Sequence, residues 1–340
     1  MSNDTIDIVA SFRSKRTIDD LSIVLVAVIW GSSYVVMQDV GRTVPAAEFL
    51  MLRFLSAVPP LAILAARTLS RLTRAEVGTG LFFGCMLYGI LMLETVGVRH
   101  TSAANAGFLI ALSVVLIPVL ERVVSKRRQQ GIVYLMAAIA VLGCGMLLLA
   151  SGGHPQSGDF IIGAAALIRA TQITLFGRRP GGADQSLINL SLIEFVVVAV
   201  LAGITAAASG TPMWQVAAAI SSRDWLLIGY LGVLGTSFAF LAQLRAARAA
   251  SSTRVGLILA TEPVFAAVFA IVAAGNRLSL AQIAGGALIV VSAAVGRTFE
   301  GRAASSMSGY GTVPCVAGRD GSSCGPAAQA AARGTPDVGL

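Results

Sequence analysis

Residues 131–153 read GIVYLMAAIAVLGCGMLLLASGG and contain no charged side chain. A helix needs about 20 mostly apolar residues to cross the ~30 Å hydrocarbon core of a bilayer, and this stretch is long enough. Further uncharged windows of similar length lie elsewhere in the chain, at Leu21–Gln38, Thr101–Leu120, Leu226–Leu244 and Leu278–Gly296. The sequence therefore predicts an integral membrane protein with several helical spans.

The composition of the whole chain points the same way. Of the 340 residues, 56% are hydrophobic and only 12% are charged, whereas soluble domains carry about 25% charged residues. The net charge of +8 does not indicate nucleic-acid binding, because the basic residues lie mostly in short gaps between apolar runs. Composition thus argues against a soluble enzyme and against a nucleic-acid binder, and it makes the lipid bilayer the expected partner of the surface.

The apolar segments predict an all-α integral membrane protein with ten transmembrane helices. No stretch alternates polar and apolar residues over about ten positions, as the strands of a membrane barrel do. The predicted spans are 21–40, 46–66, 77–98, 102–124, 130–150, 159–177, 187–208, 225–245, 253–275 and 279–297.

The distribution of Lys and Arg predicts the orientation. Nineteen of them lie in the N-terminal segment, after the even-numbered spans or in the C-terminal tail, and the alternate gaps hold only Arg42, Arg99, Arg223 and Arg277. Basic residues accumulate on the cytoplasmic side, so both termini are predicted to be cytoplasmic in a multi-pass protein of the cell (inner or plasma) membrane. Residues 1–20 are expected to form a cytoplasmic segment, and the Gly-, Ala- and Ser-rich residues 298–340 a disordered cytoplasmic tail.

The two halves of the chain resemble each other. Residues 94–111 (ETVGVRHTSAANAGFLIA) align with residues 243–260 (QLRAARAASSTRVGLILA), which pairs Arg99 with Arg248. Each half, 21–150 and 159–297, holds five predicted spans, and an odd number inverts the second copy in the membrane. Inverted repeats are frequent in secondary transporters, although channels and membrane enzymes also contain repeats.

Short motifs occur in a fixed order along these spans: Trp30-Gly31-Ser32-Ser33-Tyr34, Arg53-Phe54, Thr101-Ser102-Ala103 with Asn105-Ala106-Gly107-Phe108, Glu262-Pro263-Val264-Phe265-Ala266, and Gln282 with Gly285-Gly286-Ala287-Leu288-Ile289. Their order and spacing resemble the EamA group of the drug/metabolite transporter superfamily. The resemblance implies ten helices in two EamA repeats, cytoplasmic termini, and transport of a small metabolite, often by export. It also implies a glutamine where this chain has Glu94.

Charged residues inside the spans are candidates for substrate binding or for structural ion pairs, because a charge at bilayer depth costs about 2.5–3.5 kcal/mol on insertion scales. Arg53 either anchors an anionic group of the substrate or pairs with Glu48 or with an acid on another helix. Glu94 either lines the transport pathway or pairs with Arg99. Arg169 and Glu194 are predicted to pair across adjacent helices.

Glu262 is the sharpest candidate in the spans. The next residue, Pro263, cannot donate its amide, so the predicted ninth span should kink there; Pro118 is its counterpart in the first half. Freed carbonyls beside a carboxylate form a polar spot of the kind that broken helices provide in transporters. Glu262 then handles substrate or protons, or it is a structural acid paired with Arg169 or Arg53.

Uncharged residues complete the predicted substrate-binding set. Trp30 and Tyr34 lie four residues apart on one face of the first span, and they form either the wall of a ligand site or part of the packed core. Tyr88 in the third span has the same two interpretations. Asn105 and Gln243 can hydrogen-bond either to a substrate or to a neighbouring helix.

The leading hypothesis is a secondary transporter that exports a small metabolite, such as an amino acid or a related anion, by alternating access, with protons as candidate coupling ions. The alternative is a non-transporting membrane enzyme or a scaffold. No catalytic residue, metal site or cofactor is expected, and no G-x-x-x-x-G-K-[S/T] phosphate loop occurs. Glycine seams such as Gly80-x-x-x-Gly84 offer a surface for a homodimer.

Overall fold

The computed structural model describes residues 3–125, 131–150, 156–176, 185–210, 212–249, 255 and 258–308. Internal contacts divide the chain into Met1–Glu300 and Gly301–Leu340, and the fold and the site described below belong to the first unit. Of the second unit, only residues 301–308 are described, and they form the end of the last helix. All regular secondary structure in the described ranges is helical, as the sequence predicts.

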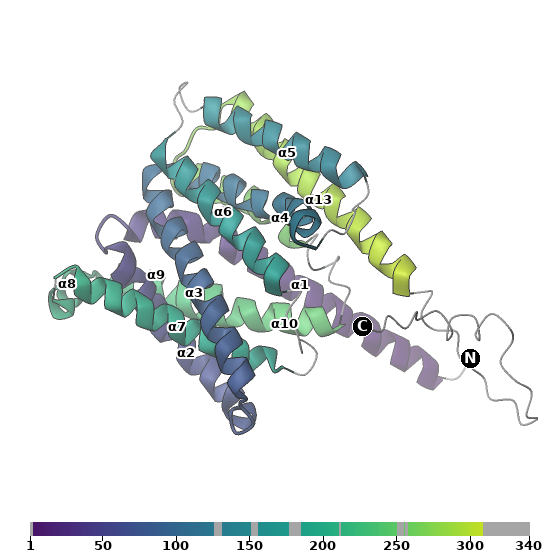
Figure 1. Cartoon of the computed structure of the whole chain (residues 1–340), viewed down its shortest axis with the longest axis horizontal. Coiled ribbons are helices and arrows are strands. Elements are labelled where there is room, and N and C mark those ends of the chain that lie inside the picture. The colour runs from purple at the N-terminus through teal and green to yellow at the C-terminus, as the bar shows by residue number, and fades with distance from the viewer. Residues whose placement is uncertain are drawn as a thin grey trace, which may run out of the picture. The chain divides into compact units, whose positions relative to one another are not determined.

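The helices are labelled in Figure 1. They are α1 (Asn3–Val40), α2 (Ala46–Leu69), α3 (Arg74–Gly97), the 3-10 turn η1 (Val98–His100), α4 (Ala103–Ser125), α5 (Gly131–Ala150), α6 (Ser157–Phe176), α7 (Leu187–Ala208), α8 (Met213–Ala219), α9 (Ser222–Gly232), the π-helical segment η2 (Val233–Phe238), α10 (Ala239–Ala249), α12 (Glu262–Val272) and α13 (Leu280–Ser308).

Seven helical segments of the described chain are long and apolar enough to cross a membrane: Ile18–Val40, Ala46–Leu69, Arg74–His100, Ala103–Val123, Ser157–Phe176, Leu187–Ala208 and Ser222–Gln243. Three shorter apolar helices, Tyr134–Met146, Glu262–Val272 and Leu280–Gly296, fall within the remaining predicted spans. The count of ten crossings therefore stays a prediction, while the multi-span, all-helical class agrees with the structure.

Polar side chains mark where several helices begin. The Thr73 side chain accepts from the backbone N–H of Glu76, and the Glu76 carboxylate accepts from the backbone N–H of Thr73, so α3 starts with a complete capping box. Ser186 and Ser221 cap α7 and α9 by the same kind of side-chain bond to a backbone N–H. The polar gaps between apolar runs thus act as helix starts.

Three parts of the fold differ from the prediction. The first residues of the predicted tail are helical as far as Ser308, because α13 continues past residue 297. The short helix α8 lies between the seventh and eighth predicted spans and was not expected. The eighth span changes from α-helix to π-helix at Val233 and back at Ala239.

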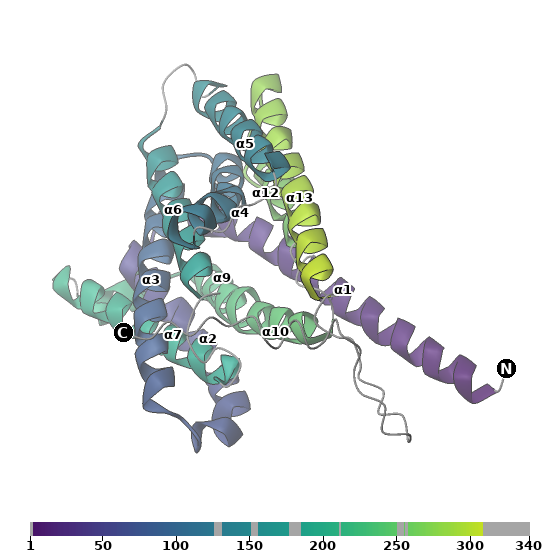
Figure 2. The same ribbon diagram turned by 45° about the vertical axis from the view of Figure 1, so that its right-hand side comes forward.

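The packing places α1 at the centre of the first unit. It contacts α4, α9, α10 and α12, while α2 and α3 pack against α7, and α6 packs against α3 and α4. Helices α5 and α13 lie side by side in both ribbon views (Figure 1 and Figure 2). At their contact, a Cβ added at Gly143 would lie 2.6 Å from the carbonyl oxygen of Gly285, so small residues let the two backbones approach.

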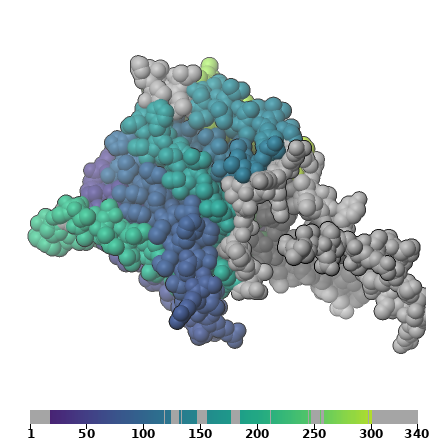
Figure 3. All heavy atoms as spheres, viewed as in Figure 1, coloured from purple at the N-terminus to yellow at the C-terminus, as the bar shows by residue number. Residues whose placement is uncertain are grey.

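Large apolar side chains cover much of the surface. Ile63 is 76% exposed, Phe160 63% and Leu226 75%, and these residues belong to α2, α6 and α9. Figure 3 shows one face of the molecule, on which α3, α6 and α7 meet the surroundings; the exposed residues of these helices include Phe82, Leu167 and Ile204. Such a surface is costly in water and is typical of helices that face lipid.

Candidate functional site

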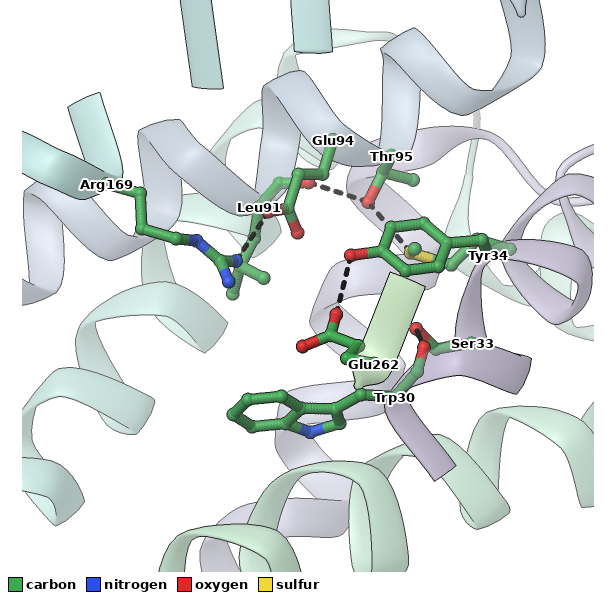
Figure 4. Close-up of polar contacts among 9 residues, drawn as sticks. Trp30, Ser33, Tyr34, Leu91, Glu94, Thr95, Arg169 and Glu262 are labelled. Carbon is green, nitrogen blue, oxygen red and sulfur yellow. Dashed lines mark hydrogen bonds and ion pairs between the residues drawn. The ribbon is translucent and has the colours of Figure 1, made fainter. Parts of the chain in front are cut away.

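Polar side chains from four helices meet inside the first unit, as Figure 4 shows. Tyr34 comes from α1, Glu94 from α3, Arg169 from α6 and Glu262 from α12. Three of these residues were predicted substrate-binding residues, and Arg169 was a predicted ion-pair residue. We refer to the four as the central cluster.

The first contact of the central cluster joins α1 to α12. The Tyr34 hydroxyl donates to Oε1 of Glu262 over 2.8 Å, and Tyr34 is 3% exposed. Glu262 lies in the first turn of α12, where the helix dipole favours a negative charge. The buried Pro263 also lies in this first turn, a position that proline tolerates because it needs no amide hydrogen. The predicted kink is therefore a break, with turn residues Ala260 and Thr261 before a new helix.

Glycines hold the start of α12 in place. A Cβ at Gly31 of α1 would lie 2.5 Å from Cβ of Phe265 and 2.8 Å from the backbone nitrogen of Ala266. A Cβ at Gly107 of α4 would clash with Cβ of Ala266. Because both glycines lack that atom, α1 and α4 come close enough to α12 to fix the position of the Glu262 carboxylate.

The second contact of the central cluster is an ion pair. Nη2 of Arg169 lies 2.5 Å from Oε1 of Glu94, and the two side chains are 25% and 6% exposed. Arg169 thus has a partner that the sequence did not predict, and its pairing with Glu194 stays a prediction. The ion pair corrects the alternative that pairs Glu94 with Arg99, whose guanidinium donates to the Val44 carbonyl instead.

Arg53 lies beside the central cluster and is held by η2. Its Nε donates to Oγ1 of Thr236 over 3.0 Å, and its guanidinium carbon lies 5.9 Å from the ring centroid of Phe54. Arg53 is 6% exposed. The structural alternative predicted a pair with Glu48, but the Glu48 carboxylate accepts from the Ser209 hydroxyl at 3.3 Å, and no ion pair to Arg53 is found in the part of the chain that the structure describes.

The π-helical segment η2 and the end of α9 also form hydrogen bonds with α1. Trp30 donates its indole N–H to the carbonyl of Gly235 over 2.8 Å, and Ser32 and Tyr230 share a hydrogen bond of 2.8 Å between their hydroxyls. Sequence reasoning missed Thr236 and Tyr230. The signal nearest to them in the sequence is the three-residue spacing of Gly229, Gly232 and Gly235.

The remaining predicted site residues are not brought to the central cluster. Tyr88 bonds to Thr205 of α7 over 2.6 Å between the two hydroxyl oxygens. Asn105 accepts from the Gln282 side chain of α13 at 3.2 Å. Gln243 donates to the carbonyl of Ala239 in its own helix over 3.2 Å. Pro118 lies within α4.

The charges of the site act on one another. Glu94 is coupled electrostatically to Arg169 and to Arg53, and Glu262 is coupled to Arg169 and Glu94. With both acids ionised, two guanidinium and two carboxylate groups balance. No group of three His, Cys, Asp or Glu residues within the described ranges is placed to hold a metal ion. The arrangement suits reversible binding of a polar molecule by charge and hydrogen bonds.

The contacts of the central cluster, and those of Arg53, Trp30 and Ser32 described above, join the two predicted halves of the chain. Trp30, Ser32, Tyr34, Arg53 and Glu94 lie in residues 21–150, and their partners Gly235, Tyr230, Glu262, Thr236 and Arg169 lie in residues 159–297. The polar centre of the first unit is therefore an interface between halves. Transporters with internal repeats place their substrate sites at such an interface.

Comparison with known proteins identifies the halves. The sequence profile of the EamA-like transporter family matches residues 17–149 and again residues 156–296. No curated protein matches the chain. Among solved structures, a crystal structure of a protein matches with a TM-score of 0.57 and 20% identity, covering 86% of this chain and 99% of the other, which shows a shared fold. Two profile copies across most of a multi-span helical membrane protein lead to one conclusion: the chain belongs to the EamA-like transporter family, a family of membrane transporters.

Proposed function

We propose that the chain is a secondary transporter of the cell (inner or plasma) membrane that exports a small polar metabolite, such as an amino acid or a related compound, by alternating access. The central cluster and Arg53 form its substrate site. Both termini face the cytoplasm in this proposal, as the distribution of Lys and Arg predicts.

One observation carries the proposal. The Tyr34–Glu262, Arg53–Thr236 and Glu94–Arg169 contacts each join the first repeat (17–149) to the second repeat (156–296). A carrier that works by moving one repeat against the other needs its binding groups at this interface, where the motion exchanges their access to the two sides.

Contacts near the predicted outer ends of the helices support alternating access. Arg223 of α9 pairs with Asp39 of α1 over 2.7 Å, and Oγ1 of Thr43 donates to Asp224 over 3.2 Å. The Gln38 side chain donates to the carbonyl of Thr101 over 3.0 Å. These contacts tie the helix ends together on that side, so the structure fits a state in which the outer end of the pathway is closed.

Export from proteoliposomes tests the proposal. Vesicles that contain the purified full-length protein are loaded with a mixed cytoplasmic metabolite extract, and retained compounds are measured by mass spectrometry with and without a pH gradient. Selective loss of one class of compound is the expected result. Loss no greater than from protein-free vesicles, with protein whose folding has been verified by its unfolding temperature, contradicts transport and favours a non-transporting membrane protein.

Proton coupling has its own prediction, at Glu262. If this carboxylate carries the proton, Glu262→Gln keeps the hydrogen bond to Tyr34 but removes the titrating group, so transport loses its acceleration by the pH gradient. Glu48→Gln is the matched control, because Glu48 is a buried acid outside the central cluster. Gradient-driven efflux by Glu262→Gln at the wild-type rate shows that another group carries the proton.

A further inference from the structure

Arg53 is the one guanidinium of the site whose charge is not matched by an ion pair. Arg169 has the Glu94 carboxylate, whereas Arg53 has, among the described residues, only the neutral hydroxyl of Thr236 as a hydrogen-bond acceptor. A guanidinium carries five N–H donors, so its two terminal nitrogens keep four donors without an acceptor in the described chain. A buried charge without a counterion is unfavourable unless an anion joins it.

The surroundings fix the direction of this guanidinium. The Thr236 hydroxyl donates to the carbonyl of Leu231, five residues earlier, over 2.9 Å, so its oxygen is left to accept from Nε of Arg53. The neighbouring Ser237 hydroxyl donates to the carbonyl of Ala57 on α2 over 2.6 Å. The wide turn of η2 therefore holds Thr236 and α2 together. With Nε occupied, the terminal nitrogens form the fork that matches the two oxygens of a carboxylate.

A close contact between backbones keeps this geometry rigid. A Cβ at Gly232 would lie 2.5 Å from the carbonyl oxygen of Arg53 and would overlap the Ser56 hydroxyl. The Ser56 hydroxyl itself donates to the Arg53 carbonyl over 2.7 Å. The Arg53 backbone is thus fixed against α9 at the residue directly before η2, so little ordering is needed when an anion binds.

We infer that Arg53, held by Thr236 of the π-helical segment, is the binding group for a carboxylate on the transported molecule. This inference rests on the proposed function and specifies the chemistry of its substrate. The charged residues coupled to Arg53 are Glu94 and Arg169, which neutralise each other, so the positive charge of Arg53 remains available. A carboxylate bound bidentately to the fork supplies the acceptors that the terminal nitrogens of Arg53 lack among the described residues. Uncharged amides of the same molecules lack the negative charge and should bind weakly.

Trp30 provides a local reporter of this subsite, because its indole bonds to Gly235, the residue before Thr236. The chain has three tryptophans, and Trp214 and Trp225 lie exposed near helix ends, so Trp214→Phe/Trp225→Phe leaves Trp30 as the only one. The purified full-length variant is titrated with aliphatic, hydroxy, keto, amino and aromatic carboxylic acids and with the primary amide of each. Trp30 emission is expected to change saturably with at least one acid. The primary amide of that acid is expected to bind at least tenfold more weakly.

Variants of Arg53 connect this signal to the guanidinium. Arg53→Gln should abolish the preference for the acid over its amide. Arg53→Lys keeps the charge without the fork and should weaken acid binding about tenfold, and Thr236→Val should weaken it less. Arg42→Gln, at an exposed arginine of the outer end, should bind like the wild type. The inference is overturned if amides bind as tightly as acids, if a folded Arg53→Gln keeps the preference, or if none of the acids changes the emission.

A transport measurement on the same compounds separates this inference from the proposed function. If acids bind with the expected preference but none leaves loaded proteoliposomes, the transport proposal fails and the carboxylate subsite stands. If amides leave the vesicles as fast as the acids, the protein is a transporter and the carboxylate subsite is wrong.

Discussion

At the scale of single residues, each charged side chain of the central cluster has a specific partner. Glu94 and Arg169 neutralise each other at 2.5 Å, and Glu262 is held by the Tyr34 hydroxyl at 2.8 Å. Charges at this depth are tolerated only when they are paired or face an aqueous path. The central cluster thus keeps its acids in place with one ion pair and one hydrogen bond.

A double-mutant cycle tests the ion pair. Arg169→Gln leaves the nearly buried Glu94 carboxylate without its partner. Breaking a fully buried ion pair costs about 3–5 kcal/mol. Because the Arg169 side chain is 25% exposed, we expect a smaller loss of stability here, about 2 kcal/mol. Glu94→Gln should cost a similar amount, and the double variant should be more stable than either single one. Thermal unfolding in detergent measures all three. Additive effects of the two single changes contradict a direct pair.

Residue types were more predictable than pairings. Tyr34, Arg53, Glu94 and Glu262 stood out because polar groups inside apolar spans are costly, whatever the packing. Their partners depend on which helices adjoin and how each is rotated. Neither property follows from hydropathy. The sequence analysis therefore paired Arg169 with Glu194, on the expectation that their helices are adjacent, and did not find the pair with Glu94.

At the scale of secondary structure elements, two interruptions of regular helix supply polar groups of the candidate site. The break before Glu262 places a carboxylate in the first turn of α12, and η2 exposes the Gly235 carbonyl and the Thr236 hydroxyl to α1 and α2. The first interruption could be anticipated from Pro263. The second has no proline, and π-helical turns depend on tertiary contacts such as those of Thr236 and Ser237, so periodicity predicted one continuous helix there.

Substitution at Gly31 tests how tightly α12 is held. In Gly31→Ala, the added methyl group meets Phe265 and the Ala266 backbone nitrogen, so we expect a loss of about 1–3 kcal/mol of stability from overpacking together with slower transport. Gly89→Ala in α3 is the control, since no atom lies within 4 Å of its added Cβ, and it should gain up to about 1 kcal/mol. The unfolding temperatures of both variants measure these effects. Equal shifts in unfolding temperature for Gly31→Ala and Gly89→Ala would mean that α1 and α12 are not in close contact.

At the scale of the whole first unit, hydropathy predicted the positions of the apolar helices well, because each apolar run has to be buried or face lipid. It could not predict how the two repeats meet. The predicted outer ends of α1 and α9 are joined by the partly exposed pair Asp39–Arg223. Such surface pairs contribute about 0–1 kcal/mol, so the proposed alternating access would break this contact at little cost.

Cross-linking tests whether that opening is required. In a background with Cys85, Cys144, Cys315 and Cys324 replaced by serine, Asp39→Cys/Arg223→Cys is treated with a short, reducible reagent that joins two thiols. Because the reagent fixes α1 of the first repeat to α9 of the second, transport should fall to the level of protein-free vesicles and return after reduction. The single cysteine variants, treated in the same way, should transport normally. Undiminished transport by the cross-linked protein would show that this end stays closed throughout the cycle.

The bonds between repeats also set conditions for biosynthesis. A chain is made from its N-terminus onward, so α2 and α3 enter the bilayer with Arg53 and Glu94 before α6 and η2 have been translated. The two residues carry opposite charges and interact in the completed fold, so we expect them to pair with each other during that interval. Once α6 has been inserted, Arg169 forms its ion pair with Glu94. Arg53 then bonds to Thr236, so in the proposed transporter the insertion of the second repeat is the step that frees the terminal nitrogens of Arg53 for a carboxylate.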